Sequence, residues 1–123
     1  MALSRLAAQF AAEIQLMEWS DTPYRFDRAG HDRSRDSKAG PDVLTPNETE
    51  KVKINAAMVT AQVLAYNDPN FNVYEFAEAC GINTLTSSGR RNHGFEAALR
   101  GINGRYDRPG TYEPDPEPSA KQS

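Results

Sequence analysis

The sequence predicts an all-α fold, a small bundle of about four helices: one amphipathic and N-terminal, one long and central, and two short ones towards the C-terminus. Apolar residues recur at intervals of three and four in several segments. Capping residues, prolines and glycines bound these segments, and no convincing strand alternation is present. With 123 residues, we expect one helical domain over residues 1–107 and a disordered, acidic, proline-rich tail over residues 108–123.

The first helix is predicted over about residues 2–19, where the turn sequence Asp21-Thr22-Pro23 ends it. Its apolar stripe consists of Leu3, Leu6, Phe10, Ile14 and Met17. The simpler interpretation is that this stripe packs on the rest of the domain. Leu3, Phe10 and Met17 are also spaced by sevens, so the alternative is a self-association helix.

Residues 22–43 are predicted to form a long polar loop, because this segment has too few apolar residues to nucleate a core. Such loops are usually either functional or disordered. The loop is therefore a solvated linker or a partner-binding segment, and the second interpretation rests on a cluster of aromatic and arginine residues: Tyr24, Arg25, Phe26 and Arg28.

The second helix has a well-marked start, with Thr45 as cap, Pro46 at the first position and Glu48 completing a capping box. We expect it to end at the sequence Asn-Asp-Pro-Asn of residues 67–70. Its apolar residues form two rows, so we expect it to be central: one row is Val52, Ala56, Val59, Val63 and Tyr66, and the other is Ile54, Met58, Ala61 and Ala65.

The third helix is predicted between the cap Asn72 and Gly81, with Phe71 and Phe76 spaced as a hydrophobic staple. Gly81 suits a left-handed residue, after which Ile82 folds back onto the helix in a Schellman closure. The side chains expected to face the core are Val73, Phe76, Ala77 and Cys80.

The last helix has several possible starts between residues 84 and 92, and glycines at 101 and 104 predict its end. Its apolar positions are Phe95, Ala98, Leu99 and Ile102.

The net charge of −3 is unevenly distributed along the chain. Residues 24–41 carry five basic and three acidic side chains, and residues 89–112 carry five and two. These segments predict two basic patches. The segment 42–80 is acidic, with six carboxylates against two lysines, so a nucleic-acid partner would have to approach one face of the protein.

The segment 73–92 is the strongest candidate for a functional motif. The sequence A-x-x-x-G-I at residues 77–82 resembles the centre of a helix-turn-helix, where a small residue allows close crossing, glycine makes the turn and an apolar residue anchors it. The sequence departs from that pattern at residues 87–89, where Ser-Ser-Gly replaces the apolar anchors of a recognition helix. We expect a degenerate helix-turn-helix-like corner at 73–102, or an ordinary capped corner between two helices.

The leading hypothesis is a DNA-binding accessory or regulatory protein that meets duplex DNA through one basic face. Polar and basic side chains contact phosphates and base edges, and here they would be Thr84, Thr86, Ser87, Arg90, Arg91, Asn92, Arg100 and Arg105. The alternative is a protein-interaction module, either a subunit of a larger particle or a small inhibitor. Its expected contact residues are Leu3, Phe10, Met17, Tyr24, Arg25, Phe26 and Arg28.

We expect no enzyme, cofactor or metal. His31 and His93 lack a second histidine or cysteine at ligand spacing, and no glycine-rich phosphate loop precedes a helix. No segment has the roughly 20 apolar residues needed to span a bilayer. The single cysteine, Cys80, favours a buried structural thiol and a cytoplasmic location.

Overall fold

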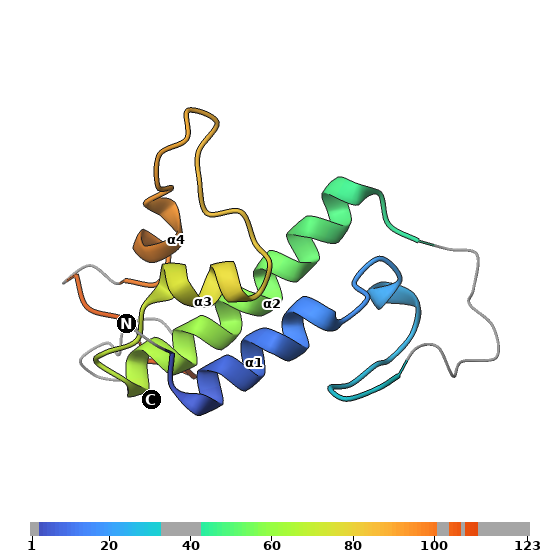
Figure 1. The fold of residues 1–123 in the computed structure, drawn as a ribbon, viewed down its shortest axis with the longest axis horizontal. Helices are drawn as coiled ribbons and strands as arrows, with labels where there is room; N and C mark the ends of the chain where they lie inside the picture. Colours follow the sequence, from blue (N-terminus) through green and yellow to red (C-terminus); the bar gives the residue numbers. More distant parts are fainter. Residues whose placement is uncertain (1–2, 33–42, 101–103, 107, 111–123) are drawn as a thin grey trace, which may run out of the picture.

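The computed structural model describes residues 3–32, 43–100, 104–106 and 108–110. Within these ranges the chain forms four α-helices and one short 3-10 helix (Figure 1). In chain order they are α1 (Arg5–Leu16), η1 (Thr22–Tyr24), α2 (Pro46–Asn67), α3 (Val73–Ala79) and α4 (Gly94–Ala97). The predicted all-α bundle is confirmed. Among the described residues the β-pairing is limited to two isolated bridges.

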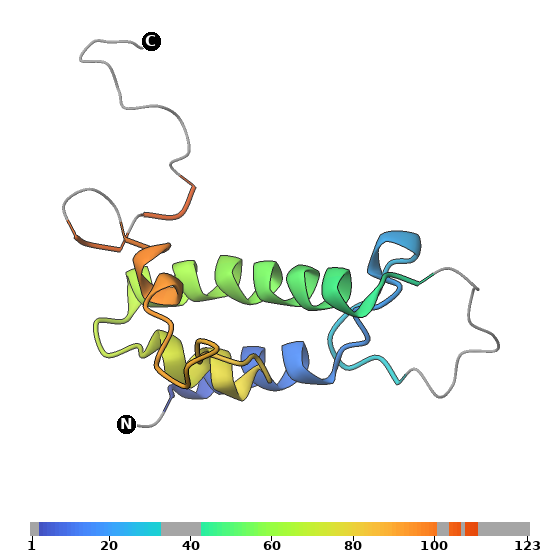
Figure 2. The same ribbon diagram turned by 90° about the horizontal axis from the view of Figure 1, so that it is seen from above.

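The helices are arranged around the length of α2. Helices α1 and α3 pack against each other and against α2, and both lie on the same side of α2 in Figure 2. Helix α4 contacts α3. One side of α2 therefore faces the core, while the opposite side faces away from it.

Small side chains dominate the core between the three longer helices. Helix α1 buries Ala7, Ala11 and Ile14, and α2 buries Ala57, Ala61, Leu64 and Ala65. The predicted stripe of α1 is wrong in part, because Leu6 and Phe10 are 56% and 43% exposed. The alanines allow the helices to approach closely, so the buried face of α1 is centred on its alanine row, and the larger side chains lie outside it.

The first helix is also shorter than the predicted 2–19. Ser4 caps it by accepting a hydrogen bond from the Ala7 amide at 3.1 Å. The helix ends at Leu16, and the indole Nε1 of Trp19 donates to the carbonyl of Ile14 at 2.8 Å. Trp19 therefore satisfies a terminal carbonyl of the helix and does not extend it.

The predicted capping box of α2 is confirmed. The Glu48 amide donates to Thr45 Oγ1 at 3.1 Å, and the Thr45 amide donates to Glu48 Oε1 at 3.0 Å. The two apolar rows differ in burial. The row containing Ala61 and Ala65 faces the core, whereas Val59, Val63 and Tyr66 of the other row are exposed.

Helix α3 agrees with its prediction. Asn72 accepts hydrogen bonds from the amides of Tyr74 and Glu75. Gly81 has φ +85, and the Ile82 amide donates to the Ala77 carbonyl at 3.0 Å, which is the predicted Schellman closure. The four predicted core positions of α3 are buried: Val73, Phe76, Ala77 and Cys80.

The last helix departs most from expectation. It comprises only four residues, and residues 84–92 form a short hairpin instead of its first turns. Leu85 and Arg91 form an antiparallel bridge, and Gly89 adopts φ +86 at the turn. The sequence Ser-Ser-Gly favours a tight reversal of the chain over the first turns of a helix, and this explains why residues 84–92 form a hairpin. Ile102 lies outside the described residues.

Two predictions concern segments that are described only in part. Of the predicted loop, residues 22–32 and 43 are described, and apart from η1 they contain no helix or strand. Of the predicted tail, residues 108–110 are described and residues 111–123 lie outside the description. Within the ranges that are described, no helix has both the length and the apolar character needed to cross a bilayer.

Candidate functional site

The hairpin of residues 84–92 projects away from the helices (Figure 1). Two backbone hydrogen bonds close it, from the Thr86 amide to the Arg90 carbonyl at 2.6 Å and from the Asn92 amide to the Thr84 carbonyl at 2.8 Å. At its tip, Thr86 Oγ1 and Ser88 Oγ are 3.0 Å apart. The hairpin therefore presents short hydroxyl side chains and Arg90 to solvent.

Tyr74 of α3 holds the base of the hairpin. Its hydroxyl donates to the Asn92 carbonyl at 2.9 Å, and the Arg91 guanidinium lies 4.3 Å above the centre of its ring. The ring of Phe95 meets Tyr74 edge to face, with 6.4 Å between the centroids. Because Tyr74 is buried in the core-facing helix, these contacts fix the hairpin relative to the bundle.

The structure brings only part of the predicted nucleic-acid set together. Thr86, Ser87, Arg90 and Arg91 are exposed on the hairpin. Thr84 is 3% exposed, and its hydroxyl donates to Glu78 Oε2 at 2.9 Å, so it is not available to a ligand. Asn92 accepts a hydrogen bond from the Gly94 amide through its side chain. The last helix does not start among residues 84–92, as the sequence allowed, because α4 begins only at Gly94.

Arg100 belongs to a separate, internally paired cluster. Its Nη2 donates to Glu96 Oε2 at 2.5 Å, its Nη1 donates to the Gly104 carbonyl at 2.7 Å, and its guanidinium lies 4.1 Å above the Tyr106 ring. The hydrogen bond from Arg100 lowers the pKa of the Glu96 carboxyl, and burial raises the pKa of the Tyr106 hydroxyl. A phosphate would have to compete with Glu96 for this arginine. Arg105 is exposed next to the cluster.

A second candidate surface is apolar and lies on α2. Val59, Val63 and Tyr66 are 69%, 43% and 46% exposed, and they follow one another at helical spacing on the outer face. Beside them lies a groove of about 590 Å³ between α2 and the chain that follows α4. Its lining residues are Asn55, Met58, Val59, Gln62, Val63, Ala98, Leu99, Pro109 and Gly110. Gln62 Nε2 donates to the Leu99 carbonyl at 3.1 Å and closes one side of the groove.

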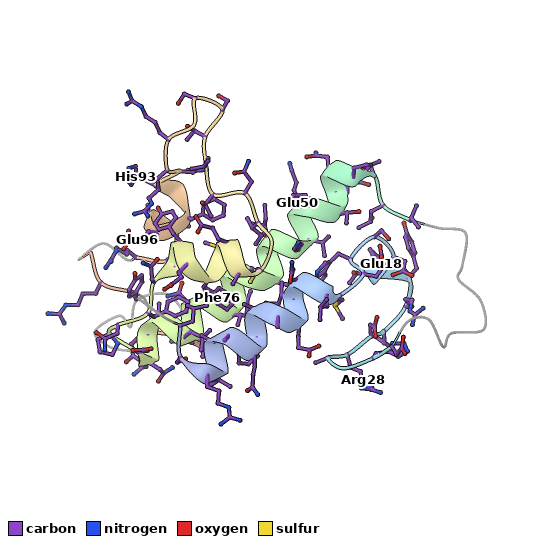
Figure 3. All side chains as sticks on the ribbon, viewed as in Figure 1. Glu18, Arg28, Glu50, Phe76, His93 and Glu96 are labelled. Carbon is purple, nitrogen blue, oxygen red and sulfur yellow. The ribbon has the colours of Figure 1, made fainter. Side chains whose placement is uncertain are left out.

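The partner-binding residues predicted from the sequence lie on other parts of the molecule. Phe10, Tyr24 and Phe26 are exposed, and Phe26 entirely so, whereas Leu3 is partly buried against the core. Met17 and Arg25 are half-buried, and Arg28 is exposed, with its Nη1 donating to the Ala29 carbonyl. Figure 3 shows Arg28 and Glu18 at the opposite end of the molecule from His93 and Glu96. The two predicted regions therefore do not combine into one site.

Two further groups among the described residues are the pair of His31 and Asp27 and the buried thiol of Cys80. His31 Nδ1 lies 2.5 Å from Asp27 Oδ1, yet in the described part of the chain no group of three or more His, Cys, Asp or Glu is placed to hold a metal ion. Burial raises the pKa of the Cys80 thiol to about 11, which keeps it protonated and unreactive near neutral pH.

Compared with known proteins, the chain matches no family model, no curated protein and no solved structure. Two surfaces of the protein are therefore candidates for a functional role, the basic hairpin and the outer face of α2.

Proposed function

We propose that the protein is a non-enzymatic protein-interaction module that binds a protein partner through the outer face of α2. The observation that carries this proposal is the inverted burial of that helix. Alanines at positions 57, 61 and 65 are buried, while the larger Val59, Val63 and Tyr66 are exposed in one row.

The exposed apolar row of α2 would contribute free energy to binding if a partner covered it. Burying a side chain as large as valine stabilises a protein by about 1.5–3 kcal/mol relative to leaving it exposed. Single exposed apolar residues are common, but a continuous row next to an apolar groove is typical of an interaction site. Pairing with another protein would cover the row at little cost, because the backbone of α2 is already ordered by its packing on α1 and α3.

Site-specific photo-crosslinking in cells that express the full chain tests the proposal. A benzophenone amino acid at Val59 should form adducts with protein. The same group at Leu16, which is 75% exposed on α1, is the matched control and should form few. Equal labelling from both positions, or no protein adduct from Val59, would overturn the proposal.

A second candidate function is nucleic-acid binding, and the basic hairpin specifically favours it. Arg90 and Arg91 are adjacent and exposed on a segment that projects from the bundle. Cations on such a projection can reach phosphates without requiring the rest of this acidic protein to approach them.

Fluorescence anisotropy on mixed duplex DNA across a salt series tests this second candidate. Binding that weakens as salt rises and is lost in the Arg90→Glu/Arg91→Glu double variant would support it, because phosphate contacts release counterions. A double variant that binds like the wild type, or an absence of binding at low salt, would eliminate it.

A further inference from the structure

We propose that the partner of the α2 face is a second copy of this chain, paired through two antiparallel α2 helices. This inference rests on the proposed function and names its partner. It differs from the self-association through α1 that the spacing of Leu3, Phe10 and Met17 suggested, because the observations that carry it lie on α2.

The outer row of α2 has the spacing of a helix–helix seam. Val52, Ala56, Val59, Val63 and Tyr66 follow one another at intervals of four, three, four and three, which is the alternation of core positions in a coiled coil. Val52 and Ala56 are half-buried and the other three are exposed. The row extends over about 21 Å at 1.5 Å per residue. Both α1 and α3 lie on the opposite side of α2 (Figure 2). The chain that follows α4 flanks the row on one side, where Leu99 and Pro109 line the groove. Val59, Val63 and Tyr66 remain exposed, so a second helix can reach them from the side away from the groove.

The sizes of the seam residues favour an antiparallel pair. If the two-fold axis passes near residue 61, Ala56 of one copy lies opposite Tyr66 of the other, and Val59 lies opposite Val63. The smallest side chain then meets the largest at both ends, which fills the interface evenly. A parallel pair would place the two tyrosines opposite each other and leave the two alanines separated by a gap.

The charges of α2 favour the same orientation. All charged residues inside the helix lie in its first eight positions: Glu48, Glu50, Lys51 and Lys53. In a parallel pair each of these would lie near its own equivalent, which brings like charges together. In an antiparallel pair the two charged ends are far apart. The seam is flanked by the neutral Thr60 on one side and by Asn55 and Gln62, which line the groove, on the other.

The mass of the full chain in solution, measured by sedimentation over a range of concentrations, is the first test. We expect a dimer that dissociates on dilution. Val63→Glu should raise its dissociation constant on the order of 100-fold or more, because the symmetric interface would bury two carboxylates without partners. Leu16→Glu is the matched control and should leave the dimer unchanged. Circular dichroism verifies that both variants remain folded.

Disulfide trapping tests the orientation. Ala56→Cys and Tyr66→Cys chains, distinguished by a tag on one of them, are mixed and oxidised, while the buried Cys80 is retained. Antiparallel pairing predicts that the mixed Ala56→Cys/Tyr66→Cys dimer predominates. Parallel pairing would give the two homodimers instead and would overturn the proposed arrangement.

The photo-crosslinking experiment separates this inference from the proposed function. Adducts from Val59 with twice the mass of the chain support self-pairing. Adducts only with other proteins, together with a monomer at every concentration, overturn self-pairing and leave the proposed function standing. The absence of any protein adduct overturns both.

Discussion

The guanidinium of Arg91 lies 4.3 Å above the ring of Tyr74, whose hydroxyl donates to the carbonyl of Asn92 at 2.9 Å. Tyr74 of helix α3 therefore contacts two consecutive residues of the hairpin. The face of its ring contacts Arg91, and its hydroxyl binds Asn92. This arrangement fixes the position of Arg91. The hydrogen bonds of Arg90 to other described residues come from its backbone, which bonds to Thr86. The rigidity of the hairpin depends on Tyr74.

Tyr74→Phe should loosen the hairpin while leaving the bundle folded. The change removes one partly buried hydrogen bond, which contributes about 1 kcal/mol. Backbone amide exchange at Thr86 and Asn92 should accelerate, while exchange in α2 should stay the same. Tyr24→Phe, at an exposed tyrosine, serves as the control. Unchanged exchange at both hairpin amides would mean that the hydroxyl does not hold the hairpin.

Gly81→Ala should destabilise the protein more than Gly89→Ala. Both glycines have positive φ, +85 and +86, which costs a residue with a Cβ about 1 kcal/mol or more. At Gly81 the added Cβ would also lie 3.2 Å from Gln15 Cγ and 2.9 Å from Lys53 Nζ, whereas at Gly89 it would have no atom of a described residue within 4 Å. Denaturant unfolding of the two variants measures the difference. Equal stabilities would show that steric contact at Gly81 has no effect.

Cys80 should make the fold less stable above pH 9. Burial raises the pKa of its thiol from 9.0 to about 11, so the unfolded chain loses this proton first as the pH rises. The stability from the neutral thiol is complete below pH 9 and is lost as the pH rises through about 11, with a total on the order of 2 kcal/mol. The free energy of unfolding, measured by chemical denaturation, should therefore decrease less between pH 8 and pH 10.5 for Cys80→Ala than for the wild type. An identical decrease in both proteins would contradict this prediction.

Arg100→Gln should raise the pKa of Glu96 towards its ordinary value. The hydrogen bond from Arg100 is the largest cause of the lowered pKa of that carboxyl. A lowered pKa contributes stability above the ordinary pKa of 4.5, and that stability is lost as the pH falls through the lower value in the folded protein. The loss should be small because the Glu96 side chain is 37% exposed. NMR titration of the Glu96 carboxyl carbon measures the shift, and an unchanged midpoint would show that Arg100 does not set this pKa.

The helix boundaries that were predicted well are those with local capping chemistry. Thr45 with Glu48 and Asn72 with Glu75 form the predicted hydrogen bonds. After Gly81, the Ile82 amide donates to the Ala77 carbonyl, as predicted. These interactions connect residues within five positions of each other, so the sequence contains all of their partners. The start of α4 lacks such a signal, since five different residues could cap it, and there the prediction failed.

The candidate sites were harder to predict because they depend on long-range packing. Thr84 is a residue type that often binds ligands, but its hydroxyl donates a hydrogen bond to Glu78 and its side chain is buried in the bundle. The outer row of α2 was visible in the sequence as one of two equivalent apolar rows. Its spacing of four and three is the signal for an interaction seam, but the same spacing also fits the buried face of a central helix.

The sequence by itself determined the helical class, the ends of α2 and α3, and the burial of Val73, Phe76 and Cys80, because periodicity and caps act over one or two turns. The tertiary structure decided which face of each amphipathic helix is buried. On α1 and α2 the alanine rows, including Ala11 and Ala61, occupy the contact between helices, because small side chains allow the closest approach. That choice leaves larger apolar side chains on the surface, and it depends on how three helices fit together, which no single segment specifies.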